Sequence, residues 1–225
     1  MNILENDISL GNGIYSIPDL ALILRLPSHK IRKWLNDYWD IRFGEQYKGK
    51  YSWGEGRNKA TNFYTLIEFY VFYQLRELKV STKTILASHK LMAEQLNTPY
   101  PFASSAILTD GKKIIYSLED GTTVSADKSK QILFKQIIES FCKKIQFSET
   151  KLAERYWPLG KAHNIIVDPH HQFGQPVIAE TNLLAETIYD LHRAGETKKF
   201  LSSLYKISPK EVNDAIAFYN TKAAA

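Results

Sequence analysis

Proline at position 27 separates two short amphipathic segments, and this break constrains the N-terminal fold more than any other feature of the 225-residue sequence. Proline disfavours helical geometry in the residue before it, so a first helix must end just ahead of this position. Ser16 is a candidate N-cap for that helix, and Pro18 and Asp19 suit its first turn. Ser28 is the candidate N-cap of a second helix. The sequence therefore predicts two short helices joined by a tight turn.

The second of these helices has two chemically different faces. Ile31, Trp34 and Leu35 fall on one side at helical spacing and form an apolar face. A helix with a basic outer face, placed after a tight turn, has the geometry of a recognition helix that enters the DNA major groove. The predicted DNA contacts on this outer face are Ser28, His29, Lys30, Arg32 and Lys33.

The stretch that follows alternates glycines with aromatic residues from Phe43 to Arg57, a pattern typical of short strands and tight turns. A basic hairpin directly after a recognition helix would form a wing that contacts DNA phosphates and sets affinity and register. The alternative interpretation is a solvated turn that binds nothing. The candidate wing contacts are Lys48, Lys50, Arg57 and Lys59.

The net charge of +5 is spread unevenly along the chain. Residues 17–59 contain nine Lys or Arg against five Asp or Glu, whereas residues 165–222 contain six against seven. Basic residues gathered in one part of a chain indicate a polyanionic partner there. We therefore expect the N-terminal part, rather than the C-terminal one, to bind nucleic acid.

Two longer helices are predicted next. Residues 61–79 carry a wide, aromatic-rich apolar stripe, and a further helix is expected from Ser81 or Thr82 to about Leu96. Such a stripe is typical of a helix-pair core or a dimer surface. Its members are Leu66, Phe69, Tyr70, Tyr73 and Leu78.

Residues 97–160 have a different pattern. Asp110-Gly111 favours a tight primed turn, so a hairpin is predicted between residues 107–109 and 112–116, with a third strand at 122–124. An amphipathic helix is predicted from Gln131 to Phe147, with Ile145 in its apolar stripe. We interpret this part as a small three-stranded sheet plus a helix that connects the two ends of the chain.

The C-terminal segment resembles the N-terminal one in pattern. Strands are expected at 165–167 and 177–178, followed by helices at 183–192 and 197–204 and a third helix capped by Ser208. Three short helices in this order indicate another helix-turn-helix bundle. The predicted fold is mainly α with small β elements, divided into an N-terminal winged helix-turn-helix at 1–96, a connecting region at 97–160 and a C-terminal three-helix domain at 161–222.

Enzymatic chemistry is not indicated. His170 and His171 lie beside Asp168, but neighbouring strand residues point to opposite faces and no further ligand has metal-site spacing, so turn residues are the better interpretation. Glycine-rich phosphate loops, nucleophile elbows and zinc-protease helices are absent from the sequence. We expect no catalytic residues, no metal and no cofactor.

The cysteine content and the N-terminus bear on the compartment. Cys142 is the only cysteine, and it is expected to be a buried helix residue rather than a nucleophile. No run of about 18 apolar residues suggests a membrane span, and the first residues do not resemble a secretory signal. A reducing cytoplasm is therefore the expected location.

Residues 14–92 resemble the DNA-binding head of MerR-type regulators. The resemblance rests on Tyr15-Ser16-Ile17 before an apolar helix, on Ser28-x-x-Ile31-Arg32-Lys33-Trp34, on Tyr64-Thr65, and on Leu78-Lys79-Val80-Ser81 before the next helix. It implies a winged helix-turn-helix that binds operator DNA. The segment at 43–63 is longer than the usual wing of that family.

Residues 163–219 resemble a bacterial antitoxin family long described only as a domain of unknown function, whose members accompany toxins with PIN-like ribonuclease folds. The matching residues are Asp168-Pro169, Gly174, Pro176-Val177-Ile178, Thr181, Ala194-Gly195, Tyr205, Val212, Ala215 and Ile216. Together with the MerR-like head, the chain resembles the longer VapB-type antitoxins. The resemblance implies that the chain neutralises a PIN-like toxin by direct binding and binds its own operon as a homodimer.

The chain departs from the antitoxin pattern at three positions. Gln175 and Asn182 stand where that family usually has basic residues, and Glu180 stands where glycine is usual. Fewer cations weaken phosphate binding. We therefore predict that the C-terminal domain dimerises or grips the toxin while the N-terminal head binds DNA. Two alternatives remain: a stand-alone MerR-like transcriptional regulator without a toxin, and a protein-binding scaffold with no DNA role.

Overall fold

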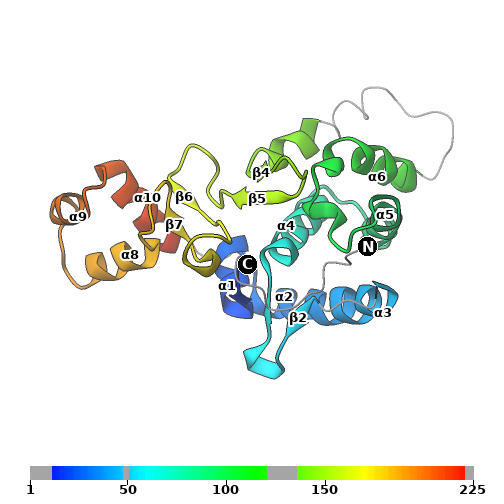
Figure 1. Cartoon of the computed structure of the whole chain (residues 1–225), viewed down its shortest axis with the longest axis horizontal. Helices are drawn as coiled ribbons and strands as arrows, with labels where there is room; N and C mark the ends of the chain where they lie inside the picture. The colour runs from blue at the N-terminus through cyan, green and yellow to red at the C-terminus, as the bar shows by residue number, and fades with distance from the viewer. Residues whose placement is uncertain (1–11, 48–50, 121–135, 221–225) are drawn as a thin grey trace.

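The computed structural model describes residues 12–47, 51–120 and 136–220. Within these ranges the chain is mainly helical, with small antiparallel sheets, which confirms the predicted class. The molecule is elongated, with helices α8 to α10 at one end and α4 to α6 at the other (Figure 1). No helix in these ranges has the length and apolar character that crossing a membrane requires.

The first helix, α1 (Ile17–Leu24), begins as the sequence predicts. The backbone N–H of Asp19 donates to the Ser16 hydroxyl at 3.3 Å, and the Ser16 N–H donates to the Asp19 carboxylate at 2.8 Å. This reciprocal capping box satisfies two N–H groups that a helix start leaves unpaired. The helix ends at Arg25, which adopts a left-handed conformation.

The second helix continues much further than expected. Helix α2 (Ser28–Trp34) begins with Pro27 as its N-cap, so Ser28 is its first residue rather than its cap, and it runs on into a π-helix, η1 (Leu35–Phe43), and α3 (Gly44–Tyr47). An α-helix turns about 100° per residue, so a four-residue repeat drifts about 40° at each step. The wider π-turns counter this drift. They keep one repeat on the buried face: Ile31, Leu35, Trp39 and Phe43, all 0% exposed.

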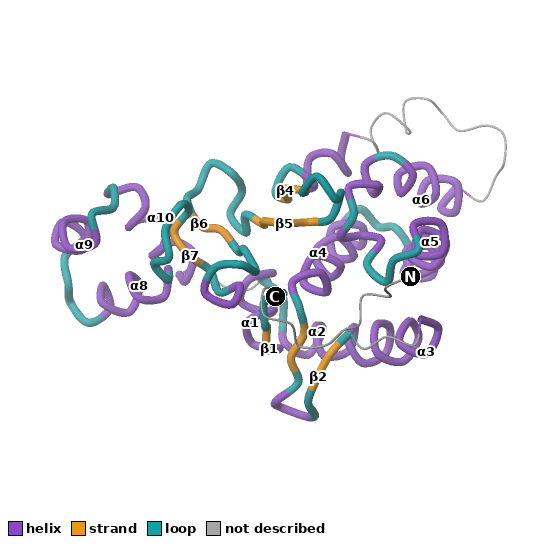
Figure 2. Tube along the Cα trace, viewed as in Figure 1, coloured by secondary structure: helices purple, strands orange, loops and turns teal. Residues whose placement is uncertain are grey.

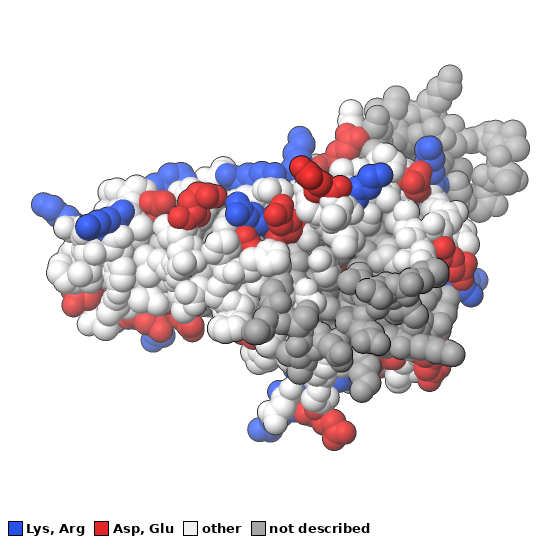
Figure 3. Space-filling view, in the orientation of Figure 1, with Lys and Arg blue, Asp and Glu red and all other residues white. Residues whose placement is uncertain are grey.

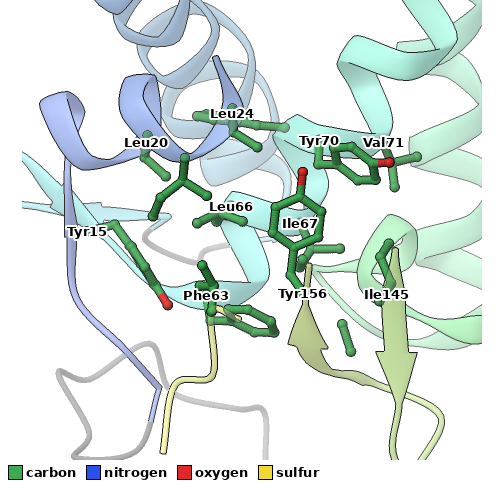
Figure 4. Packing of buried hydrophobic residues seen from close by; sticks show 14 of the residues in the cluster. Tyr15, Leu20, Leu24, Phe63, Leu66, Ile67, Tyr70, Val71, Ile145 and Tyr156 are labelled. Atoms are coloured by element: carbon green, nitrogen blue, oxygen red, sulfur yellow. The ribbon is translucent and has the colours of Figure 1, made fainter. Parts of the chain in front are cut away.

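The aromatic stripe predicted at 61–79 lies in the core of the molecule. It belongs to α4 (Phe63–Glu77), which is capped by Asn62 and followed by α5 (Thr82–Leu96), capped by Ser81. Most residues of α4 are buried. Figure 4 shows this packing, with Leu20 and Leu24 of α1 facing Leu66 of α4.

A short three-stranded sheet closes the N-terminal part. Its strands are β1 (Tyr15–Ser16), β2 (Ser52–Trp53) and β3 (Ala60–Thr61), paired antiparallel in the order β1-β3-β2. Strands β2 and β3 form a hairpin whose tip contains a 3-10 turn, η2 (Gly56–Asn58). The hairpin projects away from the body of the molecule beside α2 (Figure 1). We call residues 52–61 the hairpin.

The hairpin predicted around Asp110-Gly111 is wrong. Residues 97–120 form two 3-10 turns, η3 (Pro101–Ala103) and η4 (Ser105–Leu108), and then helix α6 (Asp110–Asp120). Gly111 lies inside that helix, where a Cβ atom would come within 2.7 Å of Ile107 Cδ1. This glycine therefore permits close helix packing rather than a primed turn. The third strand predicted at 122–124 lies outside the described residues.

The helix predicted from Gln131 to Phe147 is too long at its C-terminal end. Residues 136–142 are helical, and Cys142 is buried there as expected, whereas residues 131–135 lie outside the described part. Ile145 belongs instead to strand β4 (Ile145–Phe147), which pairs antiparallel with β5 (Ala153–Tyr156). Backbone pairing with β5 overrides the helical spacing that placed Ile145 in the stripe.

The C-terminal elements are confirmed, with ends shifted by one or two residues. Strands β6 (Ile165–Ile166) and β7 (Val177–Ile178) pair antiparallel and flank the turn η5 (Gln172–Gly174). Three helices follow: α8 (Ala185–Arg193), α9 (Lys198–Tyr205) and α10 (Pro209–Asn220). Figure 2 shows how short strands and loops lead into these helices.

The helix pairs α1–α2 and α9–α10 repeat the same local structure 181 positions apart. Helices α1 and α9 each have eight residues and a hydroxyl N-cap, Ser16 and Thr197. Each ends in a left-handed cation, Arg25 or Lys206. In each unit the residue after this cation donates its backbone N–H to the carbonyl of the residue five positions earlier. Leu26 donates to Ala21, and Ile207 donates to Ser202. We call these pairs the N-terminal unit (residues 16–35) and the C-terminal unit (residues 197–220).

The N-terminal and C-terminal parts share one continuous hydrophobic core. The Arg25 guanidinium donates to the carbonyl of Phe218 and lies 4.4 Å over its ring. Gly174, at φ +86°, lies against Tyr15, and a Cβ atom there would come within 2.0 Å of the Tyr15 hydroxyl. The two ends of the chain are therefore packed directly against each other.

Candidate nucleic-acid interface

The predicted contact residues of α2 lie on its solvent side. Ser28, His29, Lys30, Arg32 and Lys33 are exposed, while Ile31 between them is fully buried. No acidic side chain in the described part of the chain forms an ion pair with His29, Lys30 or Lys33. The helix therefore presents a positive surface that no acidic side chain of the described residues neutralises.

A layer of aromatic rings packs against the buried side of this helix and of the π-helix η1 that continues it. Trp34 packs edge-on against Phe72 with ring centroids 4.8 Å apart, and Trp39 packs against Phe69 at 4.7 Å. Phe43 stacks on His89 at 4.0 Å with the planes 17° apart. Rigid rings in edge-on and stacked contact fix the orientation of the helix that carries the cations.

A buried contact between a carboxylate and an imidazole lies under this layer, and the sequence analysis missed it. His89 Nε2 is 2.8 Å from Glu68 Oε2, and both side chains are 0% exposed. The other carboxylate oxygen of Glu68 accepts the backbone N–H groups of Phe102 at 2.8 Å and Ala103 at 3.3 Å. The only sequence signal was a glutamate inside an otherwise apolar stretch of α4. Because charges are rarely buried unless they are paired, that glutamate pointed to a partner.

The hairpin is attached to the helix by a second polar group. Lys59 Nζ lies 2.6 Å from Asp40 Oδ2 and donates to Asn36 Oδ1 at 2.6 Å. The Ser52 hydroxyl donates to the same Asp40 oxygen at 2.7 Å. The Lys59 side chain is only 20% exposed. Lys59, predicted as a phosphate contact, therefore joins the hairpin to the helix in this structure.

The other predicted hairpin residues are placed differently. Arg57 is exposed at the hairpin tip, beside Glu55. Arg32 of α2 reaches the tip and donates to the carbonyl of Gly56 at 3.3 Å. Figure 3 shows the tip as a narrow lobe that carries both basic and acidic side chains. Lys48 and Lys50 lie outside the described residues. The structure thus brings Arg57 and the α2 cations to one region.

The residues in α10 that match the α2 cations are different. By the repeat, Glu211, Asn213 and Asp214 occupy the positions of Lys30, Arg32 and Lys33, in that order. The buried positions correspond, with Val212 matching Ile31 and Ile216 matching Leu35. The C-terminal unit therefore has the backbone of the N-terminal unit without its positive face.

Asp214 joins α10 to the strand layer. It contacts His163 Nδ1 at 2.8 Å, the Asn164 N–H at 2.9 Å and Lys210 Nζ at 3.0 Å. Burial alone would raise the pKa of Asp214, but these hydrogen bonds and the lysine charge outweigh it and lower the pKa below its ordinary value of 3.8. The carboxylate is thus a structural group at neutral pH.

The histidines near Asp168 also have a structural arrangement. Asp168 is 2.8 Å from Arg155 Nε and 3.1 Å from His171 Nδ1, and it accepts the His170 N–H at 2.9 Å. Among the residues the structure describes, no group of three or more His, Cys, Asp or Glu is arranged to hold a metal ion. These contacts hold the turn between β6 and β7.

Comparisons with known proteins agree with the C-terminal resemblance. Residues 165–219 match a family described as a protein of unknown function, DUF433. The chain is 25% identical to the putative antitoxin VapB45 of Mycobacterium tuberculosis (strain ATCC 25618 / H37Rv) over 174 aligned residues. The aligned region covers 72% of each protein. The crystal structure of Rv2018 from Mycobacterium tuberculosis has the same fold, with a TM-score of 0.72 at 19% identity over 95% of this chain and 100% of that one.

Proposed function

We propose that this protein is the antitoxin of a toxin–antitoxin pair. In this proposal α2 and the hairpin form a MerR-like winged helix-turn-helix that binds operator DNA, and another part of the chain holds a PIN-like ribonuclease inactive. Similarity to a putative antitoxin over 72% of the chain supports the general role. The observation that carries the DNA-binding part is the exposed cations of α2, which form no ion pair among the described residues and lie above a rigid aromatic layer.

The geometry favours entry of α2 into a major groove. Its first two turns carry Ser28, His29, Lys30, Arg32 and Lys33, and recognition helices contact base edges with their N-terminal residues. Arg57 at the hairpin tip is placed to contact phosphate beside that groove. Lys59 contributes by holding the hairpin through Asp40 rather than by contacting DNA. Two copies binding two half-sites would give the homodimer expected of such regulators.

DNA binding is tested with the full chain and a labelled duplex that contains the promoter of its own gene. Fluorescence anisotropy should show tighter binding to this duplex than to a scrambled one. Lys30→Glu/Lys33→Glu should weaken binding to both duplexes, because two cations are replaced by anions and the repulsion between those anions and the phosphates does not depend on base sequence. Lys83→Glu/Lys143→Glu changes two exposed lysines elsewhere and is the matched control. Equal loss in both variants would contradict an interface at α2.

Toxin binding is tested by co-expressing the chain with the product of each flanking gene. We expect one product to co-purify with the chain and to degrade RNA only after it is separated from the chain. DNA binding without a partner from either gene would favour the stand-alone regulator. A partner without any DNA binding would favour the protein-binding scaffold.

A further inference from the structure

The outer face of α9 is apolar where its counterpart in the N-terminal unit is covered. Leu204 matches Ile23 of α1 by the repeat, and Ile23 is 1% exposed whereas Leu204 is 53% exposed. Phe200, one turn before Leu204, is 47% exposed. Large apolar side chains that lie side by side on one exposed helix face mark interaction sites. The same helix position is thus buried in one unit and uncovered in the other.

Helix α9 and its C-cap carry only positive charges, and the exposed Glu196 lies just before the N-cap Thr197. Lys199 and Lys206 are exposed, lie about 10 Å apart along the helix, and have no partner among the described residues. Two neighbouring lysines are occupied: Lys198 donates to Asn213 at 2.7 Å, and Lys210 donates to the Ala162 carbonyl at 2.7 Å. The available cations therefore flank the apolar pair. We call Lys199, Phe200, Leu204 and Lys206 the α9 face.

We propose that the α9 face docks the nuclease partner, on a part of that protein where an apolar groove is bordered by carboxylates. The inference rests on the proposed antitoxin function and names the surface that performs it. Nucleases that hold Mg²⁺ do so with carboxylates, so an acidic border near the catalytic centre is expected in such a partner. Phe200 and Leu204 fill the groove, and the two lysines pair with its rim.

A second copy of this chain fits the α9 face less well. Two α9 helices in contact would place lysines against lysines. Of the acidic residues of the same end, Glu186 and Asp190 lie on α8, and Glu211 and Asp214 lie on α10. Figure 3 shows mostly acidic side chains along the lower edge of this end of the molecule and both basic and acidic ones along the upper edge. A symmetric pair therefore does not bring opposite charges together across α9.

DNA also fits the α9 face less well. The exposed residues between the lysines are Phe200, Ser203 and Leu204, and only the serine offers a hydrogen-bond donor to phosphate. The helix that would enter a groove in this unit is α10, where Glu211, Asn213 and Asp214 replace the three cations of α2. An acidic protein surface matches both the apolar and the charged residues of the face.

The test uses the full chain, the co-purifying flanking-gene product and titration calorimetry. Phe200→Ala/Leu204→Ala and Lys199→Glu/Lys206→Glu should each raise the dissociation constant by about 100-fold, since central apolar anchors and close charge pairs dominate such interfaces. Glu186→Lys/Asp190→Lys, a matched reversal on α8, should change it by less than about threefold. All three variants should keep the wild-type far-UV circular dichroism and the wild-type affinity for promoter DNA.

Several results would overturn the inference. Wild-type nuclease affinity in both α9 variants would place the docking surface elsewhere. Loss of promoter binding by Lys199→Glu/Lys206→Glu would make the face a nucleic-acid surface, and dissociation of a self-dimer in sedimentation would make it a contact between copies. If neither flanking product binds the wild-type chain, the antitoxin proposal fails and this inference fails with it. If a flanking product binds the wild-type chain and binds both α9 variants with the same dissociation constant, this inference fails and the antitoxin proposal stands.

Discussion

The N-terminal and C-terminal units have the same backbone and opposite surfaces. Both join an eight-residue helix to a second helix through a left-handed cation and a buried apolar residue. In the N-terminal unit the second helix exposes Lys30, Arg32 and Lys33, and the first helix is covered. In the C-terminal unit the second helix lacks those cations and the first helix exposes Phe200 and Leu204. The comparison teaches that a helix-turn-helix backbone does not itself decide whether DNA or protein is bound.

The largest expected effect comes from giving α2 the residues of α10. Lys30→Glu/Arg32→Asn/Lys33→Asp should lower promoter affinity by about 1000-fold at low salt, because the cations that would displace counterions from the phosphates are lost and two acidic groups are gained. Anisotropy titrations at several salt concentrations would measure this loss and a shallower salt dependence. The reciprocal change in α10, Glu211→Lys/Asn213→Arg, should leave promoter affinity unchanged. A strong gain there would show that the two units are interchangeable.

The next effect compares the matched positions of α1 and α9. Ile23→Ala removes a fully buried side chain and should lower the free energy of unfolding by about 2–5 kcal/mol. Leu204→Ala removes a half-exposed one and should change it by less than about 0.5 kcal/mol. Urea denaturation of the full chain without a partner would measure both. Similar losses in the two variants would mean that Leu204 is covered in solution.

Asp214→Asn tests whether the carboxylate of Asp214 anchors α10 to the rest of the molecule, a structural role instead of a DNA-binding one. We expect the free energy of unfolding at pH 7 to fall by about 1–3 kcal/mol, since hydrogen bonds to a charged, mostly buried acceptor are weakened. Because the folded pKa is lowered, this stabilisation is present above the unfolded value and disappears as the pH falls through the folded one. The difference between wild type and variant should therefore begin to shrink at about pH 4 and vanish only below the folded pKa, measured by thermal melts at stepped pH. A constant difference across that range would assign the effect to another cause.

The smallest effect concerns the ion pair of Lys59 with Asp40. The C-terminal unit has no counterpart of this pair among the described residues. A double-mutant cycle with Lys59→Met and Asp40→Asn should give a coupling energy of about 0.5–1 kcal/mol, as expected for a partly exposed ion pair. Each single variant should weaken promoter binding only a few fold, through hairpin position. Loss as large as that of the α2 variants would instead make Lys59 a direct phosphate contact.

The sequence predicted the parts of the molecule that depend on neighbouring residues. Ser16 and Asp19 cap α1 as expected, and the break at Pro27 and the exposed face of α2 are where the pattern placed them. The three C-terminal helices followed from local caps and apolar spacing as well. These features depend on interactions between residues a few positions apart, which can be inferred from the local sequence alone.

Features that depend on distant residues were missed or misassigned. Asp110-Gly111 has the local signature of a turn, but Met92 of α5 and Ile107 surround Gly111 and a helix is formed instead. The pairing of Lys59 with Asp40, 19 positions away, was missed, and the predicted phosphate contact of Lys59 stays a prediction. A second helix-turn-helix was predicted, but its residue-by-residue match to the first went unrecognised because matching residues agree in kind, as Arg25 with Lys206, and seldom in identity.

The π-helix at 35–43 has a consequence for protein engineering. Replacing its polar residues with strong α-helix formers, such as Asn36→Ala with Asp37→Ala, is the usual way to stabilise an exposed helix. Here that change favours tighter turns, which would rotate Trp39 and Phe43 out of register with the rings that receive them. Raising intrinsic helicity in this stretch is thus expected to lower the melting temperature, so a low helix propensity is part of what makes the segment fit.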